Sequence, residues 1–495
     1  MGLNNSKITF LYTTVFFAVC TIIFLLIIFI RPIVGVADQG DFSRVFFGIT
    51  WPHPNFWESK HFFRFVTPDY KFIPFPHEKL YFSPPEVSQI YFVYLGRVAS
   101  RIVGLGHFSQ YVYAVTTGLF YILGLSLVYT ALLPKKSMSR VLLGAGLIFM
   151  FVDGRWVQWF NSLYGEPIVM IGMLLTIGLF LMINKYSEKG IPIWLMVTLA
   201  ISQVIMIGGK LQAISLIITV LIMSGFLAFT IWKKDPSWRL KLIILCALTV
   251  FQFYYCYGVY NSVGSKTNKD TLYQSVFQGL LLHADDPAKV IDEWGLDPEF
   301  INDVGKGAYN PDSFYTFGSI KSKNMQEKFF DKVTYGTVIK YYLTHPSDLT
   351  KGLQYLGSKS LQVPNSGIHP REYYVEVYEK TGKSTFAIVE HGRFTLWTNF
   401  RGGFLPKSFL FLTLFLAAVT AISVILFRRK QRTFAVLMWS LMTGGCIQFV
   451  MPYIFNGTND TAKQLMIFVF IFDLLFFGCI LFLIHEIGKF FQNNP

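Results

Sequence analysis

Charged residues are scarce in this sequence of 495 residues. Only 15% of the residues are Asp, Glu, Lys or Arg and 53% are hydrophobic, whereas about a quarter of the residues in a soluble domain are charged. Several apolar runs reach the roughly 20 residues with which a helix crosses a bilayer. The scarcity of charge therefore argues against a soluble protein and predicts an all-α polytopic membrane protein.

Sequence motifs for several other functions are missing. There is no G-x-x-x-x-G-K-[ST] sequence to cradle nucleotide phosphates, which argues against an ATP-driven pump. Nothing resembles a zinc-binding motif or a nucleophile elbow. Cysteine occurs only within apolar runs, so no disulfide framework is expected in an external loop. The five cysteines are Cys20, Cys246, Cys256, Cys446 and Cys479.

The net charge of +14 is distributed in a way that indicates a membrane and not a nucleic-acid partner. Basic residues gather in every second short connection between apolar runs, as the positive-inside rule requires. This pattern predicts cytoplasmic N- and C-termini and suits a bacterial plasma membrane. The basic connections contain Lys135, Lys136 and Arg140; Lys185 and Lys189; Lys233, Lys234, Arg239 and Lys241; and Arg428, Arg429, Lys430 and Arg432.

About ten membrane helices follow from the apolar runs and the basic connections. The first run is too long for the core of a signal peptide, so we expect a retained helix. No cytoplasmic connection is long enough to hold a nucleotide-sugar site, and chemistry outside would need a lipid-linked donor. The expected helices cover 9–30, 107–133, 141–152, 167–183, 193–207, 211–232 and 242–260, and three more start near Gly403, Thr433 and Lys463.

This topology divides the chain into three parts. Residues 1–260 form an N-terminal membrane domain whose long external loop, 32–106, is the expected catalytic loop. Residues 261–402 form a mainly helical extracytoplasmic domain, and residues 403–495 form a three-helix membrane segment. Within the first loop, the apolar residues of Pro85–Gly104 recur at helical spacing but are interrupted by arginines, which predicts an amphipathic helix lying on the membrane.

The first candidate site is the stretch "VADQGDFSR", which contains Asp38, Asp41 and Arg44. An acid in an outward-facing loop at the membrane edge suits a general base that activates a hydroxyl, and Arg44 would tune its basicity. A solvated turn that caps a helix starting at Phe42 explains the same residues. Both interpretations stay open from the sequence alone.

The second candidate is the stretch "DGRWVQWFNSLYGEP" on the next external connection. It places Asn161, Tyr164 and Glu166 at one membrane edge, facing the first loop. The alternative is a tryptophan-rich interfacial belt, formed by Trp156 and Trp159, with incidental polar residues.

Basic residues on later external connections form a candidate phosphate site. In Gly208-Gly209-Lys210 the glycines expose backbone N–H groups and Lys210 adds a charge, although a tight hairpin with an outward-pointing lysine is an alternative. Arg393 and Arg401 lie beside the eighth helix and would bind the same phosphate or form a solvated basic rim. Asp473 lies within the tenth helix, where an acid is a functional candidate by default unless a buried hydroxyl or amide holds it.

These features resemble the GT-C superfamily of integral-membrane glycosyltransferases. A short inside N-terminus and one helix precede an acidic motif in a long first external loop. Asp41-Phe42-Ser43-Arg44 is similar to the D-E-x-R pattern of the bacterial aminoarabinose-transferase branch, with Phe42 in place of the second acid, which Asp38 would supply. Together, "ADQGDFSR", "FNSLYGEP" and "SVFQGLLLHADDP" resemble the bacterial WsfD-type hexose transferases.

The resemblance implies an inverting transfer of a hexose from an undecaprenyl-phosphate donor to a cell-surface glycan acceptor. Asp41 or Asp38 would take the acceptor proton, and Arg44, Lys210, Arg393 and Arg401 would bind the donor phosphate. Glu166, Asn161 and Tyr164 would orient the acceptor or, with Asp38, hold Mg²⁺ or Mn²⁺, since metal dependence is left open. The expected partners are this donor, the acceptor and membrane lipid. A flippase or transporter, or a polymerase or ligase for lipid-linked glycans, remains the alternative.

Overall fold

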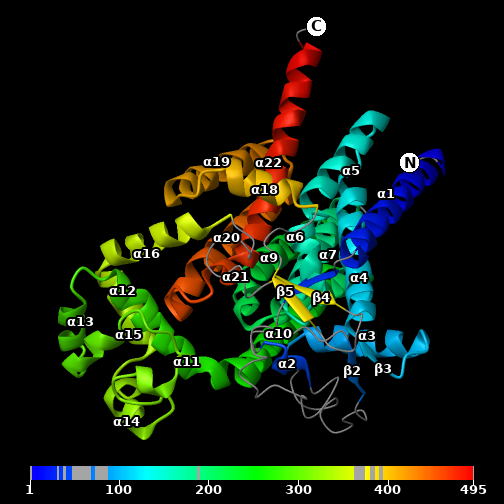
Figure 1. The fold of residues 1–495 in the computed structure, drawn as a ribbon. Coiled ribbons are helices and arrows are strands. Elements are labelled where there is room, and N and C mark those ends of the chain that lie inside the picture. Colours follow the sequence, from blue (N-terminus) through cyan, green and yellow to red (C-terminus); the bar gives the residue numbers. More distant parts are fainter. Residues whose placement is uncertain are drawn as a thin grey trace.

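Helices dominate the computed structural model, as the apolar runs predict (Figure 1). Eight of them are long and apolar enough to cross a membrane, and a bent pair brings the number to nine, within the described part of the chain. The described residues are 3–30, 33–36, 41–46, 69–72, 87–186, 190–361, 374–378, 385–388 and 394–493. The eight helices are α1 (Leu3–Phe29), α4 (Gln110–Leu132), α7 (Glu166–Tyr186), α9 (Ile217–Lys234), α10 (Trp238–Val259), α19 (Phe409–Arg428), α20 (Arg432–Asn456) and α22 (Met466–Asn493).

Each of the ten expected segments contains a helix, and the all-α polytopic fold class is confirmed. The count differs from ten for two reasons. Helix α8 (Ile193–Gly208) has only 16 residues, and α5 (Ser137–Phe151) breaks by 53° before Gly154–Phe160. The latter segment contains α6 (Gly154–Val157) and η1 (Gln158–Phe160).

The expected start of the eighth membrane helix near Gly403 is wrong. A separate short helix, α18 (Leu396–Phe404), ends there, and α19 begins at Phe409. Between them lies Pro406, which has no N–H to donate within a helix. The hydroxyl of Ser408 then caps the new helix by accepting a hydrogen bond of 3.1 Å from the Phe411 N–H.

Both termini lie at one end of the molecule (Figure 1), and the described basic connections after α4, α9 and α19 lie at that end too. The Tyr12 hydroxyl of α1 lies 2.5 Å from the Ser137 hydroxyl at the start of α5, and Arg429 forms an ion pair of 2.5 Å with Glu486 near the C-terminus. We call this the basic end. The opposite end, which carries Asp41, is called the site end. The alternating direction of the helices therefore agrees with the positive-inside pattern.

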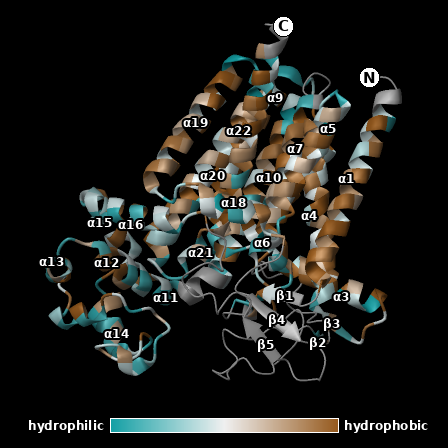
Figure 2. Ribbon diagram, turned by 45° about the horizontal axis from the view of Figure 1, so that its top comes forward, coloured by the Kyte–Doolittle hydropathy of each residue, from teal (hydrophilic) through white to brown (hydrophobic). Residues whose placement is uncertain are grey.

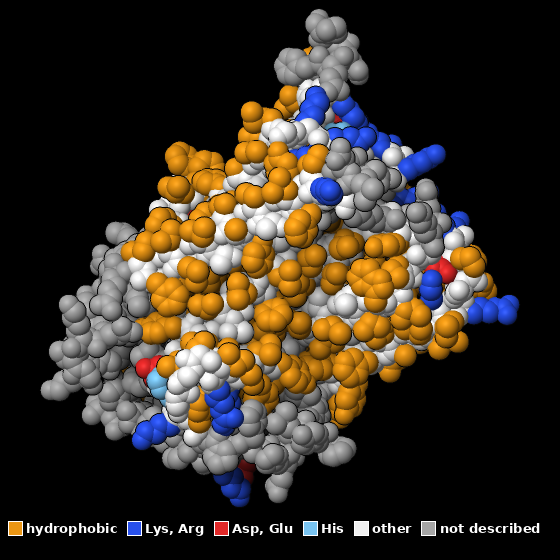
Figure 3. All heavy atoms as spheres, turned by 90° about the vertical axis from the view of Figure 1, so that its right-hand side faces the viewer, with side chains coloured by type: hydrophobic (Ala, Val, Ile, Leu, Met, Phe, Trp, Pro, Cys, Tyr) orange, Lys and Arg blue, Asp and Glu red, His pale blue; other side chains and the backbone are white. Residues whose placement is uncertain are grey.

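The helices between these two ends consist mostly of hydrophobic residues (Figure 2), and apolar side chains are spread over the face of the bundle that Figure 3 shows. On α1, for example, Phe10 is 75% exposed and Leu11 is 59% exposed. A continuous apolar surface of this kind is costly in water and marks contact with an apolar environment. The structure is therefore that of a membrane-embedded bundle.

Helix α3 (Gln89–Ile102) is the amphipathic helix expected in the first loop, and its buried face carries both apolar residues and the polar Gln89, Arg97 and Ser100. Its exposed stripe is apolar, whereas Arg97 and Ser100 are buried. The amide of Gln89 donates hydrogen bonds to the carbonyls of Leu163 and Tyr164 at 2.7 and 3.0 Å. Through these two hydrogen bonds, α3 holds the second candidate stretch in place. Its outer stripe consists of Tyr91, Leu95, Val98 and Ile102.

Two small antiparallel sheets join distant loops, and the sequence did not predict them. In the first sheet, β4 (Tyr374–Tyr378) lies between β1 (Ile33–Val36) and β5 (Thr385–Ile388), with Val36 opposite Tyr374. In the second, β2 (Asp69–Lys71) pairs with β3 (His107–Ser109). The first sheet ties the chain just before Asp41 to the end of the expected extracytoplasmic segment.

Residues 261–361 form short helices and turns at the site end. Their elements are η3 (Tyr260–Gly264), α11 (Ser265–Ser275), η4 (Val276–Leu280), α12 (Leu281–His283), α13 (Pro287–Glu293), η5 (Pro298–Asp303), η6 (Asp312–Phe314), α14 (Lys323–Met325), η7 (Gln326–Phe330), α15 (Tyr335–Thr344) and α16 (Pro346–Lys359). The expected helix after Asp286 is present, because the Asp286 carboxylate accepts a hydrogen bond of 3.1 Å from the Lys289 N–H.

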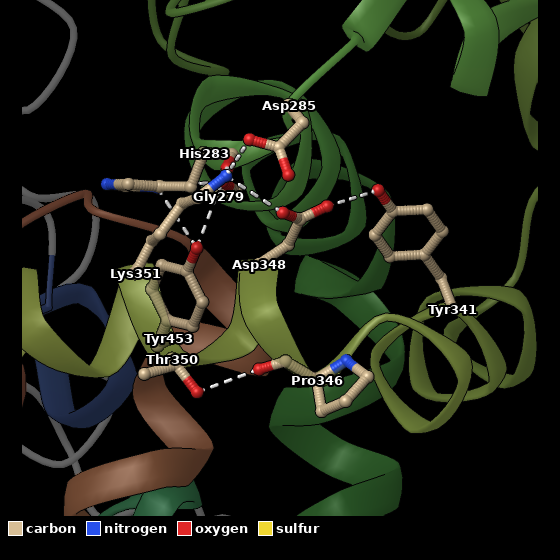
Figure 4. A network of polar contacts seen from close by, with 9 residues as sticks. All are labelled: Gly279, His283, Asp285, Tyr341, Pro346, Asp348, Thr350, Lys351 and Tyr453. Carbon is tan, nitrogen blue, oxygen red and sulfur yellow. Dashed lines mark hydrogen bonds and ion pairs between the residues drawn. The ribbon is translucent and has the colours of Figure 1, made fainter.

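A polar network fixes this segment on α20 (Figure 4). The Tyr453 hydroxyl donates to the Gly279 carbonyl at 3.1 Å and lies 3.0 Å from Nδ1 of His283. Lys351 pairs with Asp348 at 3.0 Å, and the Tyr341 hydroxyl donates to the other oxygen of Asp348 at 2.6 Å. These contacts use residues of the "SVFQGLLLHADDP" stretch as a structural joint between α12, α16 and α20.

Candidate functional site

Both carboxylate oxygens of Asp41 face a cation. Oδ1 lies 3.0 Å from Arg44, on the short helix α2 (Ser43–Phe46). Oδ2 lies 2.8 Å from Nζ of Lys463, on α21 (Thr461–Gln464). The Asp41 side chain is 18% exposed and that of Lys463 is 4% exposed. Asp41 is therefore an ion-paired carboxylate at the edge of the protein, not a solvated turn residue.

Glu166 and Lys210 form a second, more deeply buried pair. Nζ of Lys210 lies 2.8 Å from Oε1 of Glu166, and the two side chains are 8% and 1% exposed. The other oxygen of Glu166 is buried without a hydrogen-bond partner among the described residues. Lys210 therefore neither points out to solvent nor lies in an isolated hairpin, because it neutralises an acid of the neighbouring connection.

The two pairs form one electrostatic unit, which we call the charge cluster. Glu166 is among the carboxylates that act on Lys463, and Lys210 is among the cations that act on Asp41. Nζ of Lys463 lies over the Tyr164 ring, 4.6 Å from the ring centre. Such a cation–π contact is stronger when the ammonium is desolvated. The cluster consists of Asp41, Arg44, Glu166, Lys210, Asp460 and Lys463.

The cations of the cluster keep Asp41 ionised. Desolvation would raise the pKa of Asp41, but Arg44, Lys463 and Lys210 outweigh it and hold the pKa of this carboxyl well below its usual range. Conversely, burial would lower the pKa of Lys463, and the carboxylates of Asp41, Asp460 and Glu166 hold it above its usual value. At neutral pH the Asp41–Lys463 pair is therefore charged on both sides.

Aromatic packing fixes the first loop against the second candidate stretch. Phe42, the neighbour of Asp41, makes an edge contact with Tyr164 at 5.1 Å, and Trp159 packs on Tyr164 at 5.2 Å. The carbonyl of Asn161 accepts a hydrogen bond of 3.4 Å from the Val36 N–H, and its amide donates to Ile28 at 3.4 Å. Asn161 and Tyr164 thus hold the chain after α1 in place, and the expected meeting of the two stretches is confirmed.

A glutamine joins the loops that carry the two lysines. Gln212 lies in η2 (Leu211–Leu216), just after Lys210, and its amide donates to the Gln464 carbonyl at 2.8 Å. The same amide donates to Oε1 of Gln448 on α20 at 2.7 Å. Lys210 and Lys463, although far apart in sequence, therefore lie on loops that part-buried hydrogen bonds hold together.

The turn before Lys463 has an unusual backbone. Asp460, which precedes α21, has φ +49° in the left-handed region, where Asp is one of the few residue types that occur with some frequency. Backbone strain of this kind gathers at functional sites. It is consistent with a turn shaped to present Lys463 to Asp41.

Glycines allow the second and third candidate stretches to touch through their backbones. A Cβ atom on Gly165 would lie 2.1 Å from the carbonyl oxygen of Gly209. Gly165 precedes Glu166 and Gly209 precedes Lys210, so this close approach sets the distance across the Glu166–Lys210 pair.

Replacing Gly165 by alanine is therefore expected to force the two loops apart and to lower stability by about 1–3 kcal/mol, the usual cost of overpacking. The measurement is the unfolding temperature of the purified protein in detergent. Gly225 of α9 is the matched control, because a Cβ there meets nothing within 4 Å and alanine favours a helix. Equal unfolding temperatures for the two variants would contradict the proposed close contact.

Arg401 lies in a different cluster from the one expected. Its guanidinium is fully buried and forms an ion pair with Asp473 of α22. The Arg401 Nε–H also donates to the Leu361 carbonyl at 3.1 Å, and the Trp397 indole donates to Asp473 at 2.9 Å. Arg401 is therefore not part of a solvated basic rim. The partners of Asp473 are an arginine and an indole, not the hydroxyl or amide named from the sequence.

Three further expectations can be compared with the structure only in part. Trp156 and Trp159 are fully buried, so they form core and not an interfacial belt. Asp38 and Arg393 lie outside the described residues. Their expected roles, as a second acid and as a phosphate ligand, stay predictions.

The described residues do not form a divalent-cation site. Among them, no group of three His, Cys, Asp or Glu side chains is arranged to hold a metal ion. Asp41 and Glu166 are each already paired with lysine, and three cations around these acids would repel a metal. The expected Mg²⁺ or Mn²⁺ site also includes Asp38, which lies outside the described residues, so the metal stays a prediction.

Lys463 is the residue that sequence analysis missed. In the sequence it resembles an ordinary basic residue in front of the last apolar run. The available signal was its position: it lies on an external connection of the predicted topology, where the positive-inside rule disfavours lysine.

The fold and the charge cluster define a multi-pass membrane protein with a group of ion pairs at one end of its helices. The chain belongs to the family of the YfdI N-terminal transmembrane domain, whose model matches residues 4–494. No curated protein and no solved structure matches the chain.

Proposed function

We propose that the protein is an inverting glycosyltransferase that moves a hexose from a polyprenyl-phosphate donor to a glycan acceptor. The observation that carries the proposal is Asp41, a partly exposed carboxylate surrounded by Arg44, Lys210 and Lys463. In this arrangement the acid would serve as the base for an acceptor hydroxyl. The cations beside it, at the end of an apolar bundle, would bind the phosphate of a lipid-linked donor.

In the proposed reaction, Asp41 accepts the proton of the acceptor hydroxyl as its oxygen attacks the anomeric carbon. The new C–O bond forms as the bond between this carbon and the phosphate oxygen breaks. The electron pair of that bond goes to the phosphate, which leaves as polyprenyl phosphate. A single displacement of this kind inverts the anomeric configuration.

Lys463 and Lys210 are the proposed ligands of the donor phosphate. Both are buried amines held near Asp41, and preorganised cations stabilise the charge that develops on a leaving group. Arg44 is the third cation of the group. Arg401 leaves this set because it is fully buried in a separate cluster with Asp473 and Trp397, and Arg393 stays a predicted member.

We further propose that the site end faces the outside of a bacterial plasma membrane. Both termini (Figure 1) and the basic connections after α4, α9 and α19 lie at the other end, which the positive-inside rule assigns to the cytoplasm. A donor that is already outside must be carried by a lipid. The proposed acceptor is accordingly a cell-surface glycan or cell-wall polymer.

The test is a transfer assay with purified protein in nanodiscs. The donors are undecaprenyl-phosphate carrying radiolabelled glucose, galactose or mannose, and a nucleotide-linked hexose serves as the control donor. Transfer of label from at least one lipid donor, and none from the nucleotide donor, is expected. Movement of the lipid-linked sugar from one leaflet to the other in proteoliposomes, without any transfer, would instead identify a flippase. Polymerisation of a pyrophosphate-linked oligosaccharide would identify a polymerase.

A further inference from the structure

The charge cluster contains as many cations as carboxylates among its described members. Arg44, Lys210 and Lys463 balance Asp41, Glu166 and Asp460. In this balanced state Asp41 is a weak base, because two cations hold both of its oxygens. The protein without substrate therefore does not have the proton acceptor that the proposed reaction needs.

We propose that binding of the donor phosphate to Lys463 breaks the Asp41–Lys463 ion pair and thereby makes Asp41 basic only in the substrate-loaded protein. This proposal rests on the proposed function and adds a substrate-controlled step to it. The phosphodiester of the donor brings one negative charge next to Asp41. Taking up one proton on Asp41 offsets that charge at the moment when the acceptor hydroxyl must lose its proton.

The geometry favours Lys463 as the cation that moves. Arg44 lies three residues from Asp41 on the same short segment, so it remains close to the carboxylate. Lys210 is held by Glu166 at 2.8 Å. Lys463 comes from a separate helix, and its ammonium rests on the Tyr164 ring, which keeps it desolvated whichever anion it contacts.

One other titratable group faces the carboxylate from the 261–361 segment. The hydroxyl end of Tyr309 lies near Asp41 and Asp270, and desolvation together with these carboxylates raises the pKa of Tyr309 to about 12. Tyr309 therefore stays protonated between pH 5 and 9 and does not take a proton from the acceptor in place of Asp41.

Binding of a donor mimic tests the exchange without any transfer reaction. The probe is farnesyl methyl phosphate, a diester whose single charge does not change between pH 4 and 9, measured by titration calorimetry. Asp41→Asn is expected to bind the probe on the order of tenfold more tightly than the wild type, within the 5- to 150-fold range of coupled sites, because no ion pair must be broken.

A double-mutant cycle separates this exchange from simple repulsion between Asp41 and the phosphate. In a Lys463→Met background, Asp41→Asn is expected to tighten binding by less than about twofold, because the gain depends on the released lysine. Equal tightening in both backgrounds would overturn the exchange. Asp235→Asn is the matched control. It removes the carboxylate charge that lies 2.6 Å from Nζ of Lys241 at the basic end, and it should leave probe affinity unchanged.

The pH dependence gives a second readout, which needs only the wild type and Asp41→Asn if Lys463→Met does not fold. Probe binding raises the pKa of Asp41, so by linkage wild-type affinity must rise as pH falls. This rise must vanish in Asp41→Asn. A flat wild-type profile would refute the exchange even if the transfer assay succeeds, and probe binding that behaves as expected without transfer would refute the proposed function alone.

Discussion

Replacing Asp41 by asparagine is expected to lower kcat for sugar transfer by about 100-fold or more, the usual worth of a general base. The amide has the shape of the carboxylate and still accepts a hydrogen bond from Arg44 or Lys463, but it does not take up a proton. Binding of the donor should persist, because the lysines that hold the phosphate remain. The measurement is kcat and KM for the purified variant with the best lipid-linked hexose.

The control for Asp41→Asn is Asp297→Asn, which removes the same charge from a surface pair with Lys328 at 2.8 Å. It should leave kcat within about twofold. Asp38→Asn is measured beside it, because the sequence offers Asp38 and Asp41 as alternative bases and Asp38 lies outside the described residues. Activity of Asp41→Asn within tenfold of the wild type would rule out Asp41 as the base. A larger loss of activity in Asp38→Asn than in Asp41→Asn would assign the role of general base to Asp38.

The sequence predicts the membrane helices well because each is a continuous apolar run whose ends are marked by charge, Gly or Pro. The start of α7 at Glu166 and the end of α9 at Lys234 follow from this local signal. The exceptions also have local causes: α5 breaks at the polar Asp153, and Pro406 separates α18 from α19. Short strands such as β1 and β4 carry no signal, because their pairing joins residues more than 300 positions apart.

The candidate site is predictable only where its residues are neighbours in sequence. The pairing of Arg44 with Asp41 follows from a spacing of three residues. The pairing of Lys210 with Glu166, and of Lys463 with Asp41, depends on how α7, α8 and α21 pack together. The sequence therefore gives the correct stretches but not the partner of each charge, which is why Arg401 was grouped with the phosphate ligands and Lys463 was not.

Replacing Arg401 by methionine is expected to lower the free energy of unfolding by about 3–5 kcal/mol, because it leaves Asp473 as an uncompensated buried charge. Both side chains are fully buried, and Asp473 would keep only the hydrogen bond of 2.9 Å from the Trp397 indole. The measurement is chemical unfolding of the protein in detergent, followed by tryptophan fluorescence.

The double variant Arg401→Met/Asp473→Leu distinguishes a structural pair from a phosphate ligand. Replacing both partners by apolar residues of similar volume is often neutral or stabilising, so stability should recover to near the wild-type value. If the pair is structural, transfer activity should recover with it, because Lys210 and Lys463 are untouched. Restored stability without activity would return Arg401 to the donor site and would mean that the phosphate draws it away from Asp473, the same kind of exchange that we propose for Lys463 and Asp41.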